Sequence, residues 1–229
     1  MRALREKLNN MVRPPPALEV DGMFGQKTRM AVIDFQTQDW LDADGIVGPI
    51  THAALDGPPR DQNILLHPVR LIPQPTKTTC WAASTAMMTD SAVAAVKART
   101  PFVMWSDADG LYNSSGSDQA VVTGIRCGRY QGLRCNAPMS YPAGTLHAML
   151  GRGPLLFDML WRAQDYAAGA GSPGHMVVIA GICTASASDD ASFLVCDPWP
   201  PNRGRISAVD HSTGMREVPT RTYRAFERM

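Results

Sequence analysis

The spacing of apolar residues changes along the chain and divides it into two parts. Near the N-terminus Leu4, Leu8 and Met11 follow helical spacing, and an apolar stripe over Met30–Phe35 marks a second helix. Farther along, apolar residues gather into short β-rich runs bounded by Gly, Pro, Ser and Asp, namely Leu155–Trp161, Met176–Cys183 and Phe193–Cys196. This pattern predicts a small all-helical unit followed by an α+β domain.

A turn pattern occurs twice in the N-terminal part. The segment Asp21–Thr28 (DGMFGQKT) recurs 23 positions later as Asp44–Thr51 (DGIVGPIT). Glycine adopts backbone conformations that residues with a Cβ disfavour, so we expect each copy to form a tight turn that leads into a helix. Together with the stretch Val20–Gln36, the two copies resemble the three-helix peptidoglycan-binding domain. This resemblance implies binding to peptidoglycan or its peptide moiety.

A polar segment rich in Pro and Gly, Asp56–Asn63 (DGPPRDQN), interrupts the periodic pattern. Its composition is typical of a linker. The sequence therefore predicts a helical domain over residues 1–56, a linker over 57–63 and a second domain over 64–229, which is long enough to bury its own core.

An alanine-rich stretch near the start of the second domain contains a candidate catalytic residue. It predicts one long helix from Thr79–Cys80 to about Arg99, with Thr78 or Thr79 as its cap. Cys80 would lie at the start of this helix, where the helix dipole favours a thiolate. A shorter helix is expected at Thr145–Leu150, while residues 100–135 indicate no clear order of elements.

The five cysteines are an odd number, so at least one thiol has no partner within the chain. Apart from Cys80, they lie in apolar or irregular stretches at positions 127, 135, 183 and 196. Two alternatives remain open for them: disulfides Cys127–Cys135 and Cys183–Cys196, or reduced thiols.

Two polar residues flank neighbouring predicted strands. His175 begins one strand and Asp197 ends the next, so in a hairpin their side chains would reach the same end of the sheet. We expect Asp197 to accept the Nδ1 proton of His175 and to leave Nε2 facing Cys80. A nucleophile, a base and a residue that orients the base are what acyl transfer requires. Gln74, six residues before Cys80, would donate a hydrogen bond to the oxyanion together with the Cys80 backbone amide.

These residues resemble the papain-like cysteine peptidases, and most closely their bacterial papain-like and C39-like branch. The stretches that carry the resemblance are Gln74–Trp81, Gly153–Leu155, Gly174–Ile182 and Asp197–Trp199. The resemblance implies a helix packed on an antiparallel sheet.

The same resemblance implies site residues. Cys80 would be the nucleophile, His175 the general base and acid, Asp197 the orienting residue and Gln74 the oxyanion donor. The substrate-binding residues implied are Trp81 and Trp199, and Trp199 would also shield the His–Asp hydrogen bond from water. Two departures are that an Asp replaces the Asn of papain, and that no second cysteine is available for papain's disulfide near the nucleophile.

Charge and composition argue against several classes of function. The 22 Lys and Arg residues nearly balance 21 Asp and Glu residues without a basic block, which argues against nucleic-acid binding. No run of about 18 apolar residues predicts a membrane span. The cysteine spacing requires no metal, and we expect no cofactor.

The basic N-terminal residues are followed by no apolar run, so we expect no Sec-type signal peptide. The sequence thus favours a cysteine hydrolase, a peptidase or amidase, that cleaves amide bonds of cell-wall peptides. It would be secreted by a non-Sec route, or act in the periplasm or cell wall, as an antibacterial effector with an immunity protein as its partner. Two alternatives remain open: a protease of protein substrates with the wall domain as anchor, and a non-catalytic wall-binding protein.

Overall fold

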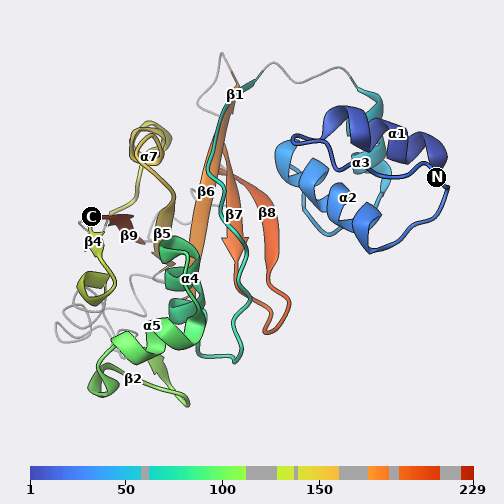
Figure 1. Ribbon diagram of the computed structural model, residues 1–229. Helices are drawn as coiled ribbons and strands as arrows, with labels where there is room; N and C mark the ends of the chain where they lie inside the picture. The colour runs from blue at the N-terminus through green and yellow to red at the C-terminus, as the bar shows by residue number, and fades with distance from the viewer. Residues whose placement is uncertain (58–61, 112–127, 137–138, 160–174, 186–190, 212–222) are drawn as a thin grey trace.

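The computed structural model describes residues 1–57, 62–111, 128–136, 139–159, 175–185, 191–211 and 223–229. It combines helices and strands: a helical unit lies at the N-terminus, and an antiparallel sheet with flanking helices forms the rest (Figure 1). The α+β expectation is therefore confirmed at this coarse level, and the N-terminal unit is helical as the apolar spacing predicted.

The helical unit consists of α1 (Arg2–Met11), α2 (Gln26–Gln38) and α3 (Pro49–Asp56). The three helices enclose one apolar core built from Leu4, Leu8, Val12, Leu18, Ala31, Val32, Phe35 and Leu55. Gly22 and Gly45 have φ values of +86° and +74° in the turns before α2 and α3. The two copies of the turn pattern therefore do lead into helices, at positions where only glycine avoids strain.

The repeated threonines hold these turns in place through buried hydrogen bonds. Thr28 accepts a hydrogen bond from Arg5 Nε at 3.0 Å, and Arg5 also pairs with Asp21 of the first turn. Thr51 accepts one from Gln36 Nε2 at 3.1 Å, while Gln36 Oε1 accepts the amide of Gly45 at 2.8 Å. The repeat thus encodes polar contacts between each turn and a neighbouring helix.

The main sheet contains seven strands among the described residues, all paired antiparallel. The strands are β1 (Gln62–Leu66), β4 (Leu133–Cys135), β5 (Leu155–Met159), β6 (His175–Ala185), β7 (Ala191–Asp197), β8 (Arg205–Asp210) and β9 (Tyr223–Arg228). Their order is β4-β9-β5-β6-β7-β8, and β1 pairs with the second half of β6. A separate hairpin joins β2 (Trp105–Ser106) and β3 (Gly110–Leu111).

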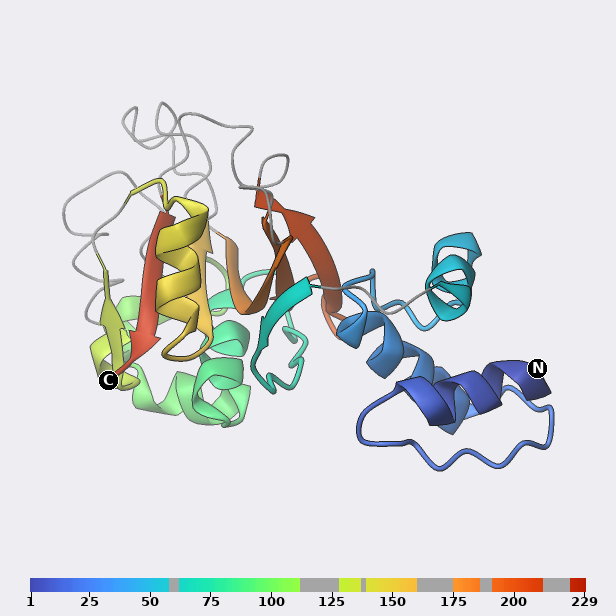
Figure 2. The same ribbon diagram turned by 90° about the horizontal axis from the view of Figure 1, so that it is seen from above.

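Helices cover the two faces of this sheet. One face, with Leu156, Val178 and Leu194, packs against α4 (Cys80–Thr89), and the other, with Phe157 and Val177, packs against α7 (Ala143–Leu150). Figure 2 shows α7 and α4 on opposite sides of the strands. This is the expected packing of a helix on an antiparallel sheet.

The single helix expected from Thr79 to Arg99 is wrong, because the chain breaks it in two. Helix α4 ends at Thr89, and α5 (Val93–Arg99) begins after Asp90, which adopts a left-handed conformation with φ 46°. Thr89 and Ser91 hydrogen-bond to each other across the break. Short polar side chains compete for backbone hydrogen bonds and so favour helix ends over helix interiors. A 3-10 turn over Phe102–Met104 follows α5.

The helical unit contacts the sheet through the loop after α2. Trp40 is buried in the same core as α4, and the Ala43 amide donates a hydrogen bond of 3.0 Å to the Ile206 carbonyl of β8. In Figure 1 this unit lies beside β8. The boundaries proposed at 57–63 stay a prediction, since residues 58–61 lie outside the described residues.

Candidate active site

The sheet topology brings three predicted site residues to one place. His175 begins β6 and Asp197 ends β7, and the neighbouring pair Val178–Cys196 shows that both lie at the same end of the two strands. Helix α4, which begins at Cys80, packs on β6 and is tied to it by a hydrogen bond of 2.7 Å from Ser84 Oγ to the Met176 carbonyl. A helix start thus meets two strand ends.

The His175 ring contacts both other residues. Its Nε2 lies 2.6 Å from Asp197 Oδ1, and the ring also hydrogen-bonds to Cys80. The expected use of the two nitrogens is therefore wrong: Asp197 takes Nε2, which leaves Nδ1 for the sulfur. Helix α4, which begins at Cys80, packs on β6, the strand that His175 begins. Asp197, one strand away, is reached by the distal nitrogen.

His175 and Asp197 stabilise the charged forms of each other. Burial lowers the pKa of His175, but the hydrogen bonds to Asp197 and Cys80 outweigh burial and raise it to about 9. Burial raises the pKa of Asp197, but hydrogen bonds from His175 and the Trp199 amide, with the charge of Arg205, bring it below its ordinary value. An imidazolium next to Cys80 favours the thiolate, which is the nucleophilic form.

Asp197 is held by further donors on the same strand end. The Trp199 backbone amide donates to Oδ1 at 2.9 Å, and Arg205 Nε donates to Oδ2 at 3.3 Å. The Trp199 indole is 41% exposed, and the part of Trp199 that contacts Asp197 is its amide. Its roles in shielding and in substrate binding stay predictions.

Gln74 is fully buried beside the loop that follows Asp197. Its backbone amide donates to the Pro198 carbonyl at 3.1 Å, and its carbonyl accepts the Asn202 amide at 2.9 Å. The side-chain Nε2 donates to the Thr76 carbonyl at 2.6 Å, which turns the amide group toward the segment before Cys80. A carboxamide carries two hydrogens, so one remains for a second acceptor. Its oxyanion role stays a prediction.

Trp81 is buried directly after the nucleophile candidate. Its ring centroid lies 5.9 Å from that of Trp105, and it belongs to the core between α4 and the sheet. This position indicates that Trp81 packs α4 in place, and its expected contact with substrate stays a prediction.

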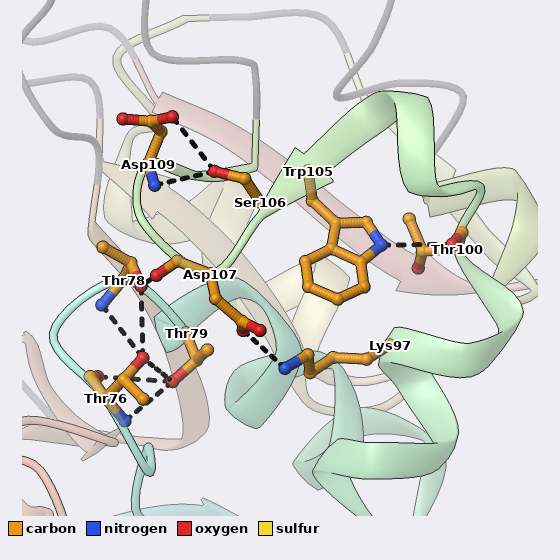
Figure 3. Close-up of polar contacts among 9 residues, drawn as sticks. All are labelled: Thr76, Thr78, Thr79, Lys97, Thr100, Trp105, Ser106, Asp107 and Asp109. Atoms are coloured by element: carbon orange, nitrogen blue, oxygen red, sulfur yellow. Dashed lines mark hydrogen bonds and ion pairs between the residues drawn. The ribbon is translucent and has the colours of Figure 1, made fainter.

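A polar cluster fixes the segment before Cys80, and the sequence did not point to it (Figure 3). Thr78 Oγ1 donates to the Asp107 carbonyl at 2.8 Å, and Lys97 Nζ pairs with the Asp107 carboxylate at 2.6 Å. The same Lys97 Nζ lies 4.6 Å from the centre of the Trp105 ring, whose Nε1 donates to the Thr100 carbonyl. The cluster therefore connects α5 and the β2–β3 hairpin to the approach of α4.

Thr79 occupies the N-cap position of α4, as expected, but its side chain does not cap the helix. Its Oγ1 instead accepts the Thr76 amide at 3.1 Å. The Thr79 side chain therefore supports the loop at Thr76 and not the first turn of α4.

The cysteines on the sheet are thiols. Cys135, Cys183 and Cys196 form no disulfide, and in the strand register Cys183 lies opposite Ser192 while Cys196 lies opposite Val178. The Cys183–Cys196 disulfide is therefore excluded. Cys135 forms no disulfide, so the Cys127–Cys135 disulfide is excluded as well; Cys127 itself lies outside the described residues.

Within the described segments, no group of three or more His, Cys, Asp and Glu side chains could hold a metal ion. The helices of those segments are all too short or too polar to cross a membrane.

A cavity of about 440 Å³ opens in the helical unit, away from the cysteine cluster. Lys7, Phe24 and His52 line it together with Leu4, Val47 and Leu55. Lys7 pairs with Asp56 beside this cavity, and the Phe24 ring is partly exposed. The cavity is therefore lined by a lysine that is paired with an aspartate, by an imidazole and by an aromatic ring.

Comparisons with known proteins bear on the helical unit. Residues 1–55 match the family of the peptidoglycan binding domain. A curated protein of Kitasatospora aureofaciens, described as an uncharacterized protein in the bpoA1 3' region, is 60% identical over 38 residues. That match covers 17% of this chain and 32% of the relative, so the chain spans about a third of the relative's length. No solved structure matches the chain. The helical unit is thus a peptidoglycan-binding domain, which indicates association with the cell wall.

Proposed function

We propose that the protein is a cysteine hydrolase that cleaves amide bonds in the peptides of the bacterial cell wall. The observation that carries this proposal is the His175 ring, which is hydrogen-bonded to Cys80 on one side and to Asp197 on the other. We also propose that residues 64–229 adopt the papain-like fold that their motifs resemble.

The reaction would proceed through an acyl-enzyme. The Cys80 thiolate attacks the amide carbonyl, and His175 gives its proton to the leaving amine as the carbon–nitrogen bond breaks. Water then loses a proton to His175 and attacks the thioester, which releases the acid and returns the thiolate. Asp197 keeps the ring in place and stabilises its charge throughout. Gln74 and the Cys80 amide would stabilise the oxyanion.

The peptidoglycan-binding domain would raise the local concentration of substrate around the cleft without new contacts at the reacting bond. In the helical unit, the cavity beside Lys7 is the site that we assign to the wall, because stem peptides carry carboxylates and glycan rings stack on aromatic faces. Delivery as a secreted effector and binding of an immunity protein stay predictions from the sequence.

Digestion of purified sacculi tests the proposal. The wild type and a Cys135→Ala control, which removes a different free thiol, should release muropeptides, and Cys80→Ala should release none. Mass spectrometry of the products identifies the bond. Release by Cys80→Ala as well as the wild type, or by neither, would contradict the proposal. If the wild type digested denatured casein in the absence of any wall fragment, the protein would instead be a protease that acts on protein substrates.

A further inference from the structure

The carboxylate of Asp197 is held at both oxygens. Oδ1 lies 2.6 Å from His175 Nε2 and accepts the Trp199 amide at 2.9 Å, while Oδ2 accepts Arg205 Nε at 3.3 Å. Arg205 is the residue directly opposite Asp197 in the β7–β8 register. The turn between the two strands therefore delivers a guanidinium to the one oxygen that neither His175 nor Trp199 occupies.

A carboxylate in this position changes the net charge of the cluster formed by Cys80, His175 and Asp197. A thiolate at Cys80 and an imidazolium at His175 are neutral together, and an amide in the orienting position would keep them so. Asp197 adds one negative charge, which would hold the proton on His175 more tightly than proton transfer to a leaving amine requires. Arg205 brings the cluster back to neutral.

We propose that Arg205 is a positioning residue of this site, which fixes the plane of the Asp197 carboxylate and balances its charge. This inference rests on the proposed function, since it concerns the same cluster. It explains how an aspartate can serve where papain has the neutral side chain of asparagine.

The other charged groups near the cluster compensate each other. Asp158 of β5 lies opposite Met176 in the β5–β6 register and forms a buried ion pair of 2.6 Å with Arg224 of β9. The charge of Asp158 interacts with His175, and Arg224 offsets it at close range. Among the described residues, Arg205 is then the side chain whose positive charge reaches Asp197 besides the imidazole.

The exposure of Arg205 makes the inference testable. Its side chain is 66% exposed, so its replacement removes no core packing. Exposed charge pairs act weakly and are screened by salt. We therefore expect a measurable change in proton affinity at low ionic strength without a change in fold.

The test follows the rate of Cys80 alkylation by iodoacetamide against pH, with the modified peptide identified by mass spectrometry. Loss of a nearby positive charge raises the proton affinity of both members of the thiol–imidazole pair. In Arg205→Gln both inflections should move to higher pH by about 0.3–0.7 unit. Arg205→Lys should recover part of the shift, and Arg203→Gln, an exposed cation of the same turn, should show less than half of it.

A second comparison distinguishes the contact of Arg205 with Asp197 from a general effect of its positive charge. In an Asp197→Asn background, Arg205 loses its acceptor and should turn to solvent, so Arg205→Gln should shift the profile by less than half as much. An Arg205→Gln profile within about 0.1 unit of wild type, or equal shifts in both backgrounds, would overturn the inference. Alkylation requires no substrate, so this result stands apart from sacculus digestion, and either proposal can fail while the other holds.

Discussion

At the scale of single residues, the His175 ring couples the candidate site to the stability of the fold. A group whose pKa is higher in the folded than in the unfolded state stabilises the fold while it is protonated. For His175, with a pKa of about 9 against an ordinary value of 6.5, this stabilisation is complete below pH 6.5 and is lost as the pH rises through 9.

The advantage in unfolding free energy of the wild type over His175→Gln should therefore shrink between pH 6.5 and pH 9. Urea denaturation followed by circular dichroism at pH 6, 7.5 and 9.5 measures it. His147→Gln, which removes a half-buried imidazole from α7, serves as the control variant. A difference that stayed constant or grew with pH would refute the linkage.

Replacement of Gln74 by alanine should lower kcat on wall peptides by about 10²–10³, the usual effect of losing one oxyanion donor. The alkylation rate of Cys80 should change far less, because the donor acts on the transition state and not on the thiol. A kcat within a few-fold of wild type would assign Gln74 to the support of the loop at Thr76 alone.

The sequence was sufficient to predict that Cys80, His175 and Asp197 lie together, because each stands at the end of an element with a clear pattern. It could not assign the ring nitrogens of His175, since they depend on how the ring is turned between Cys80 and Asp197. Arg205 was missed for a related reason: its contact with Asp197 depends on the length of the turn between β7 and β8, and a lone arginine after that turn carries no pattern.

At the scale of elements, the β2–β3 hairpin is what holds the approach to α4. Gly110 lies in this hairpin with φ +76°, and a Cβ there would lie 2.6 Å from the Thr78 carbonyl, two residues before Cys80. The hairpin and the nucleophile segment are thus in backbone contact, with no room between them for a methyl group.

Gly110→Ala should destabilise the protein by about 1–3 kcal/mol and reduce hydrolysis, because the Thr78 segment must move. Gly132→Ala is the matched control: its φ is +72°, but nothing lies within 4 Å of the added Cβ. Thermal unfolding and kcat measure the two effects. Equal losses in both variants would show that backbone strain, not the contact with Thr78, is responsible.

The elements differ in how well the sequence predicted them. Strands β5, β6 and β7 were expected within a few residues, since apolar β-rich runs bounded by turn residues are a strong signal. The hairpin was not, because its strands span two residues each and are held by tertiary contacts. The break at Asp90 was not predicted, because the alanines on both sides of it favour a continuous helix.

At the scale of the whole molecule, Trp40 joins the peptidoglycan-binding domain to the sheet. It follows α2 in a polar stretch that indicates a loop, so the sequence predicted two units but not the surface through which they meet. Its buried ring belongs to the core that α4 forms with the strands and not to the core of its own unit.

Trp40→Ala should therefore uncouple the two units, at a cost of about 3–5 kcal/mol if the cavity stays open. Calorimetry should then resolve two transitions where the wild type shows one. Met23→Ala, an exposed apolar position of the same unit, should leave a single transition. A Trp40→Ala scan that matched the wild type would mean that the contact contributes nothing to cooperativity.

The hydrogen bond from Ala43 to Ile206 has a consequence for products. If this contact fixes the peptidoglycan-binding domain relative to the sheet, Cys80 reaches only bonds at a fixed distance from the glycan to which that domain binds. Early in a digestion, fragment sizes would then cluster around a few values, whereas a freely tethered enzyme would cut at random distances and leave a smooth spread.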